Sequence, residues 1–207
     1  MLKLVDLNIE NIKSGKLINE LPEFYALKDV IENNAGHIND PVFDHCVRAG
    51  AAVLKLCAGA PQKIKEILQQ QIGAEKREEL LFIIALFHDV GKIKVSMDAQ
   101  GGFIGHEQAG AELMQSIILK RTDISSLAQA HVVSVIENHG LLHVLSNDQD
   151  HLEDRVLEAA KKQPAIFPEL ILLVLADLIA SDLIKLNPTV YNFKISFFER
   201  MLVSWSK

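Results

Sequence analysis

Apolar residues recur three and four positions apart along most of this 207-residue chain, and strict alternation of apolar and polar residues is almost absent. This spacing predicts amphipathic helices, because residues three and four apart share one face of a helix. The low aromatic content of 6% also favours helices over a β-sandwich. We therefore predict an all-α fold, a single compact bundle of packed helices over residues 1–207.

The helical spacing occurs in several segments with little glycine or proline between them. We expect helices near 43–58, 61–71, 75–89, 106–120, 123–138, 151–162, 168–186 and 194–205. Pro168 suits the first turn of a helix, whereas Gly91 and Gly140 suit positions just past helix ends. We expect residues 95–105 to form a loop.

Composition narrows the class of protein. A net charge of −6, with no run of more than two Lys or Arg residues, argues against extended binding to nucleic acid. Cys46 and Cys57 imply no disulfide framework and are expected to be small apolar fillers. The N-terminus lacks the apolar region of a signal peptide. The apolar segment 168–186 is too short between charges to span a bilayer. We therefore predict a cytoplasmic protein with no membrane partner.

The segment ALFHDVGKIKV, residues 85–95, ends an apolar run in His88 and Asp89. An ionised carboxylate at the edge of a core costs free energy unless a charge or a metal compensates it. Partners for this pair must therefore come from elsewhere in the chain. In a regular helix the two side chains would diverge by about 100°. At a helix end followed by Gly91, both could still reach one ion.

Candidate partners lie in four other places. His45 shares a helical face with apolar residues, His106 opens a helix after a Gly-rich loop, and His139 ends a helix. Asp177 carries the most information, because apolar residues flank it on both sides at helical spacing, so that it should be buried. Asp182 lies about 140° around the same helix and cannot serve one site equally well.

Histidines and aspartates together form a mixed nitrogen and oxygen ligand set. Such a set suits a divalent transition ion, or Mg²⁺ less well, and is a poor match to a structural zinc site. The residue types leave the ion open among Mn, Ni, Co, Fe, Mg and Zn, and they leave open whether one or two ions bind.

The order His45, then His88 and Asp89 in HDVGK, then Asp177 resembles the H…HD…D signature of the HD-domain metal-dependent phosphohydrolases. The resemblance implies that these four residues hold one divalent ion in a helical HD domain. An ion in this place would lower the pKa of a bound water, which could then attack phosphorus.

The likeness is broader than this signature. Residues 21–50 resemble the entry to the HD domain of bacterial tRNA nucleotidyltransferases, and FIGHEQAGAELMQSI, residues 103–117, resembles a further part of that domain. The resemblance covers residues 21–186, and we expect 187–207 to supply a C-terminal helix packed on the domain. Nothing resembles the nucleotidyltransferase head, so the chain looks like a stand-alone HD unit.

Two departures disfavour a cyclic-di-nucleotide phosphodiesterase of the HD-GYP type. Pro41 stands where some of those enzymes have a glutamate for a third metal, and no GYP motif follows His139.

The resemblance also implies roles for further residues around Asp89. His106 and His139 resemble the extra histidines of binuclear HD proteins, in which the HD aspartate bridges two ions. Alternatively, both histidines bind phosphate or protonate the leaving alkoxide. The sequence leaves both roles open.

Two cations and one histidine are candidates for binding the substrate. Lys92 and Arg48 are expected to lie near the remaining phosphate charge, although each could be an ordinary solvated cation. His37 matches a histidine of the nucleotidyltransferase-type domain and is expected to line the entrance for the substrate. His131, His143 and His151 are expected at the surface or at edges.

These observations predict a metal-dependent phosphoric ester hydrolase that acts on a phosphomonoester, a nucleotide or a 2′,3′-cyclic phosphate. The alternative is a metal-containing HD module that binds a nucleotide and regulates without turnover, because the same ligands would serve both functions. The acidic net charge argues against gripping a whole tRNA, so a small phosphorylated substrate is favoured. The oligomeric state stays open.

Overall fold

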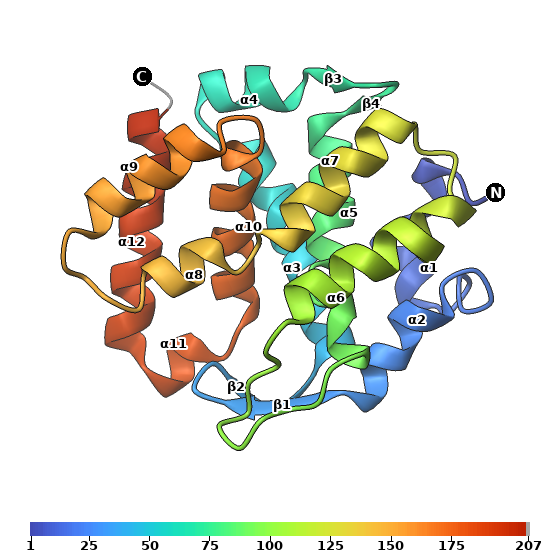
Figure 1. The fold of residues 1–207 in the computed structure, drawn as a ribbon, viewed down its shortest axis with the longest axis horizontal. Coiled ribbons are helices and arrows are strands. Elements are labelled where there is room, and N and C mark those ends of the chain that lie inside the picture. Colours follow the sequence, from blue (N-terminus) through green and yellow to red (C-terminus); the bar gives the residue numbers. More distant parts are fainter. Residues whose placement is uncertain (206–207) are drawn as a thin grey trace.

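Figure 1 shows helices of unequal length packed around one another, with short strands at the periphery. The computed structural model describes residues 1–205. The helices of the first half are α1 (Ile9–Lys13), α2 (Pro22–Tyr25), α3 (Val42–Gly59), α4 (Gln62–Leu68), α5 (Arg77–Phe87) and α6 (His106–Leu113). Those of the second half are α7 (Ser126–Glu137), α8 (Leu141–Leu145), α9 (Leu152–Lys162), α10 (Phe167–Ala180), α11 (Leu183–Leu186) and α12 (Pro188–Trp205). The predicted all-α class is confirmed.

The centre of the bundle is formed by α3, α5 and α10, which pack against one another. Every residue of α5 from Leu80 to Phe87 is buried, and so is every residue of α10 from Phe167 to Ala176. Burying one large apolar side chain contributes about 1.5–3 kcal/mol, so helices that are apolar on all sides belong in the core. Both helices therefore form part of the core.

Two helices end earlier than the spacing predicts. The segment 106–120 is α-helical only as far as Leu113 and continues as a π turn over Met114–Ile118. The segment 168–186 breaks at Ser181, whose extended backbone (φ −79°, ψ 169°) ends α10. The Ser181 hydroxyl donates to the carbonyl three residues back, a local hydrogen bond that competes with helix propagation.

Short hairpins occur where we predicted no strand. One pairs β1 (Ile31–Asn34) with β2 (His37–Pro41), and the other pairs β3 (Gln71–Ile72) with β4 (Glu75–Lys76). The first has an irregular register between Glu32 and Asn34. This irregularity removes the clean alternation by which a strand is recognised in a sequence.

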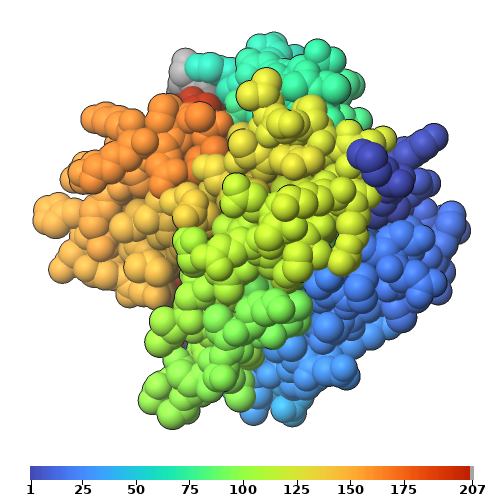
Figure 2. Space-filling view, turned by 45° about the vertical axis from the view of Figure 1, so that its right-hand side comes forward, coloured from blue at the N-terminus to red at the C-terminus, as the bar shows by residue number. Residues whose placement is uncertain are grey.

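The loop 95–105 has no helix or strand, as predicted, and it lies against the β1–β2 hairpin. Asn34 Nδ2 donates to the Gly101 carbonyl at 3.2 Å. In the space-filling view this green loop and the blue hairpin segment meet at the lower edge of the molecule (Figure 2). Within residues 1–205, no helix is long and apolar enough to cross a membrane.

Candidate metal centre

The chain changes direction at the end of α5, and this places two consecutive side chains at one site. His88 still has helical backbone angles, whereas Asp89 has φ −98° and ψ 7° and begins a 3₁₀ turn. His88 Nδ1 lies 2.9 Å from the Ala85 carbonyl. Because a carbonyl oxygen can only accept, Nδ1 carries a proton, and this contact directs Nε2 toward the Asp89 and Asp177 carboxylates.

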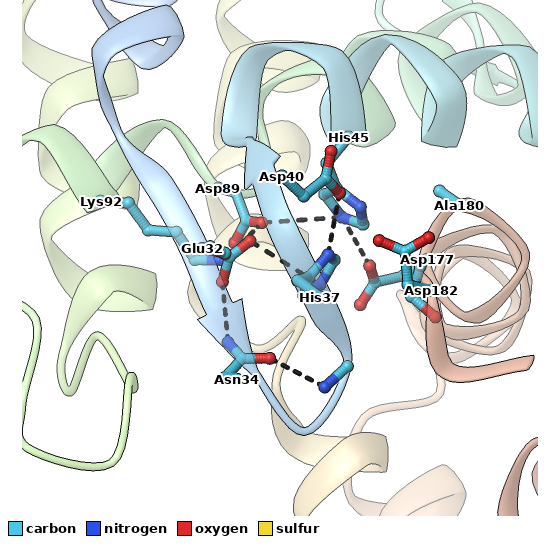
Figure 3. Close-up of polar contacts among 12 residues, drawn as sticks. Glu32, Asn34, His37, Asp40, His45, Asp89, Lys92, Asp177, Ala180 and Asp182 are labelled. Atoms are coloured by element: carbon cyan, nitrogen blue, oxygen red, sulfur yellow. Dashed lines mark hydrogen bonds and ion pairs between the residues drawn. The ribbon is translucent and has the colours of Figure 1, made fainter. Parts of the chain in front are cut away.

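His45 from α3 and Asp177 from α10 meet this pair at the centre of the bundle. His45 Nε2 lies 2.7 Å from Asp177 Oδ1, and His88 Nε2 lies 3.3 Å from Asp89 Oδ2 and 3.8 Å from Asp177 Oδ1. Figure 3 shows Asp89 and Asp177 on either side of His45. Atoms bound to one ion at about 2.1 Å lie about 3 Å apart. These four side chains could therefore hold one metal ion.

A second group shares the Asp89 carboxylate. His106 Nε2 lies 3.1 Å from Asp89 Oδ1, and His139 Nε2 lies 3.7 Å from the same oxygen. Both rings donate Nδ1–H to backbone carbonyls, those of Phe103 and Ile136. Their Nε2 atoms, 3.1 Å apart, therefore face each other as lone pairs in the neutral form. Only a cation or a proton between them relieves this arrangement.

Gly91 allows the second group, His106 and His139, to lie close to the first group, which consists of His45, His88, Asp89 and Asp177. A Cβ atom on Gly91 would lie 2.0 Å from the His106 carbonyl oxygen and 2.4 Å from the Gly110 nitrogen. The first turn of α6 thus packs directly on the backbone that follows Asp89. Glycine is required here for close approach rather than for an unusual backbone angle.

The charges at the centre favour a cation. Burial would raise the pKa of Asp89, but His88 and Lys92 hold it well below its usual range. The pKa of Asp177 is also well below its usual range despite burial, mainly because of His143. Burial opposes a charge on His88, yet Asp89 and Asp177 raise its pKa to about 10. His88 Nε2 is buried without a hydrogen-bond partner. This group of side chains therefore fits a divalent ion.

Lys92 lies within the centre and is already paired with carboxylates. Its Nζ atom lies 2.7 Å from Asp89 Oδ2 and 2.8 Å from Glu32 Oε1, and the side chain is buried. Although burial lowers it, these carboxylates raise the pKa of Lys92 above its usual value. Glu32 comes from the unpredicted hairpin, and no sequence signal singled it out.

Arg48 and His37 converge on another hairpin residue, Asp40. Arg48 donates to Asp40 and, through Nε, to the Ala180 carbonyl at 2.9 Å, while His37 Nδ1 lies 3.0 Å from Asp40 Oδ2. Despite burial, these contacts lower the pKa of Asp40 to about 2. The His37 ring stands edge-on to His45, with 4.7 Å between ring centroids (Figure 3). Arg48 is thus neutralised by Asp40.

His143 is 29% exposed, which agrees with the predicted edge position, but it also contacts the centre. Its Nε2 atom lies 2.7 Å from Asp177 Oδ2. Its place four residues after His139 is a weak signal, which the intervening Gly140 obscured. We predicted that Asp177 would be buried, but 19% of its side chain is exposed. Asp182 lies outside the group and accepts a hydrogen bond from the backbone nitrogen of Ile38.

The remaining histidines and cysteines lie apart from the centre. His131 was predicted at the surface or an edge, but its side chain is 8% exposed and contacts Glu169 Oε1 at 3.2 Å. His151 is exposed, as predicted. Cys46 is buried and Cys57 is partly buried, and neither forms a disulfide with the other.

A pocket of about 380 Å³ opens beside Asp177. Its walls come from the β1–β2 hairpin, the end of α8, the end of α10 and α12. Polar side chains from each wall face it, among them His37, His143, Asn147 and Lys194. Its volume lies within the range of small-ligand sites.

Comparison with known families agrees with this geometry. The family model described as "HD domain" matches residues 42–182, which is more than half of the chain. The chain belongs to the HD domain family. The match includes His45, His88, Asp89 and Asp177, so the HD domain supplies all four side chains of the first group. A search of curated proteins finds no match. Membership supports a metal-dependent hydrolase at the level of the superfamily.

Proposed function

We propose that this HD domain protein is a metal-dependent phosphoric ester hydrolase acting on a small phosphorylated substrate. The observation that carries the proposal is the convergence of His45, His88, Asp89 and Asp177 beside a pocket, with each of the two histidine Nε2 atoms 2.7–3.8 Å from both carboxylates. A divalent ion held by these residues would lower the pKa of a bound water and polarise a phosphoryl oxygen.

The protein's own residues would orient the reactants around this ion. His143 contacts Asp177 Oδ2 and would so fix this carboxylate, while Lys92, which is also paired with Glu32, donates to Asp89 Oδ2. Such contacts to metal ligands fix their orientation and raise affinity for the ion.

We further propose that His106 and His139 bind a second ion together with Asp89 Oδ1. The support is the geometry of both rings: Nδ1 of each donates to a backbone carbonyl, so that the two Nε2 atoms, 3.1 Å apart, face each other and Asp89 Oδ1, where an ion would be bound by all three. Two ions sharing Asp89 would divide the charge of the attacking and leaving oxygens.

A nucleotide is our preferred substrate class, for two reasons. The pocket volume suits a ligand of that size. Residues 21–50 and 103–117 resemble the HD domain of bacterial tRNA nucleotidyltransferases, which handle nucleotide ends. A 2′,3′-cyclic phosphate and a sugar phosphate are the other candidate substrates, and one hydrolysis screen can test all three classes.

The test is a hydrolysis screen with Mn²⁺, Ni²⁺, Co²⁺ and Mg²⁺ supplied in turn against nucleotides, cyclic nucleotides and sugar phosphates. Asp89→Asn is expected to lower turnover of any substrate found by more than about a hundredfold. The exposed-histidine variant His151→Ala is the control and should retain full turnover. A metal-loaded wild-type protein that binds these compounds and leaves them unchanged would contradict hydrolysis and support the regulatory alternative.

A further inference from the structure

The pocket beside Asp177 has one wall that lies outside the HD domain match. This wall is α12, which follows residue 182, and it contributes Lys194. Another wall contributes Asn147, just beyond the end of α8. Asn147 lies within the family match, whereas Lys194 lies outside it, so the match does not account for all of the pocket's charge.

The two cations expected to bind phosphate are already neutralised. Lys92 is paired with both Asp89 and Glu32, and Arg48 is paired with Asp40. Each would have to give up a carboxylate to bind a phosphate. A phosphate entering the pocket therefore needs positive charge from another side chain as well as from the ion.

Lys194 has the required charge and position. Its side chain is 8% exposed, it lines the pocket, and its Nζ donates to Asn147 Oδ1 at 3.0 Å. Among residues 1–205, no carboxylate forms an ion pair with it. One neutral acceptor leaves the other donors of the ammonium group available. Burial lowers the pKa of Lys194, and the Asp177 carboxylate opposes that shift.

The end of α8 connects Lys194 to the centre. His143 lies in α8 and Asn147 in the turn that follows it, and both side chains line the pocket. His143 contacts Asp177 Oδ2, whereas Asn147 contacts Lys194 Nζ. Lys194 and Asp177 thus line one pocket, joined along its wall by Asn147 and His143.

We propose that Lys194, held by Asn147, forms a phosphate-binding subsite in this pocket. The subsite binds phosphate oxygens that the metal centre does not hold. This rests on the proposed function, because that function brings a phosphorylated substrate into the pocket. The phosphate is either the one that is hydrolysed or a second one on the same substrate, and in both cases Lys194 selects for the anionic group.

Titration calorimetry of Mg²⁺-loaded protein with inorganic phosphate and with pyrophosphate tests the subsite directly. Lys194→Met is expected to weaken one or both affinities by about tenfold to a hundredfold, the range for a hydrogen bond to a charged group. Lys185→Met is the matched control, because Lys185 is exposed, pairs with Asp182 and lies outside the pocket lining.

A second variant separates binding from folding. Asn147→Asp keeps the shape of the side chain and the contact to Lys194 but neutralises the ammonium, so it should weaken phosphate binding as Lys194→Met does. Lys194→Arg should retain most of the affinity. Melting temperatures measured alongside report whether each variant is folded.

The possible outcomes distinguish failure of the proposed subsite from failure of the proposed hydrolase function. Weaker binding of inorganic phosphate in Lys194→Met assigns the subsite to the phosphate that is hydrolysed, and weaker binding of pyrophosphate alone assigns it to a second phosphate. Unchanged affinities for both ligands in folded Lys194→Met and Asn147→Asp overturn the subsite, even where hydrolysis is found. If affinity falls while no phosphoester is hydrolysed, the subsite stands and the hydrolase does not.

Discussion

Asp177 is held between two imidazoles: its Oδ1 atom lies 2.7 Å from His45 Nε2, and its Oδ2 atom lies 2.7 Å from His143 Nε2. One oxygen thus faces the metal centre and the other faces α8. This relationship gives His143 a role that is separate from those of the four ligands, because it holds a carboxylate in place without facing His88 or Asp89.

His143→Ala should therefore weaken metal binding without abolishing it. Residues that orient metal ligands usually change affinity by about tenfold to a hundredfold. Calorimetric titration with Mn²⁺ measures the change, with His151→Ala as an exposed-histidine control. An affinity equal to that of the wild type would show that Asp177 needs no such support.

Metal removal should lower stability, because the ion binds only the folded arrangement of ligands. At an ion concentration about 100 times the dissociation constant, the ion would add about 2.7 kcal/mol. The melting temperature of wild-type protein should fall on addition of a chelator and recover with Mn²⁺. Asp89→Asn should show a much smaller shift, and a shift equal to that of the wild type would place the ion elsewhere.

Gly91→Ala should destabilise the protein and disturb the second group of ligands. The new Cβ would lie 2.0 Å from the backbone oxygen of His106, so α6 must move. Overpacking of this kind costs about 1–3 kcal/mol in the free energy of unfolding. Gly59→Ala, at the end of α3 with no atom within 4 Å of the added Cβ, is the control and should change stability by less than about 1 kcal/mol. Urea denaturation measures both, and equal effects would contradict the close packing at Gly91.

A buried ion pair away from the centre predicts the response to acid. Glu169 is fully buried and accepts two hydrogen bonds of 2.6 Å from Arg77. Although burial raises it, His131 and Arg77 lower the pKa of Glu169 below its ordinary value of 4.5. Its stabilising contribution is therefore complete above the unfolded-state pKa and is lost as the pH falls through the folded-state pKa.

Glu169→Gln should thus be less stable than wild type at neutral pH by about 3–5 kcal/mol, because Arg77 loses its charged partner. The difference should shrink as the pH falls below about 4.5. Urea denaturation between neutral pH and pH 4 measures it. Glu158→Gln, in an exposed pair with Lys162, is the control and should show little change at any pH. A difference in stability between wild type and Glu169→Gln that stays constant with pH would contradict the lowered pKa of Glu169.

The sequence predicted the helical core and the meeting of His45, His88, Asp89 and Asp177, whereas their role as metal ligands stays a prediction. Long apolar segments such as α5 and α10 have an unmistakable helical spacing, and a carboxylate such as Asp177 within one stands out because burial must be compensated. The structure brings this residue to His45 and His88, as that reasoning expected, although Asp177 keeps some exposure toward the pocket.

The hairpin residues could not be predicted in the same way. Glu32 and Asp40 lie on short polar strands with an irregular register, and nothing local marks them as buried acids. Only tertiary packing shows that they neutralise Lys92 and Arg48. The same holds for His143, because α8 has five residues and is too short for periodicity to show.

Crystals grown with Mn²⁺ and measured for anomalous scattering test the central claim most directly. We predict a peak within about 2.3 Å of His45 Nε2, His88 Nε2 and one carboxylate oxygen each from Asp89 and Asp177. Well-ordered crystals with no peak among these four side chains, or with the ion bound only by the hairpin residues around Asp40, would contradict the metal centre.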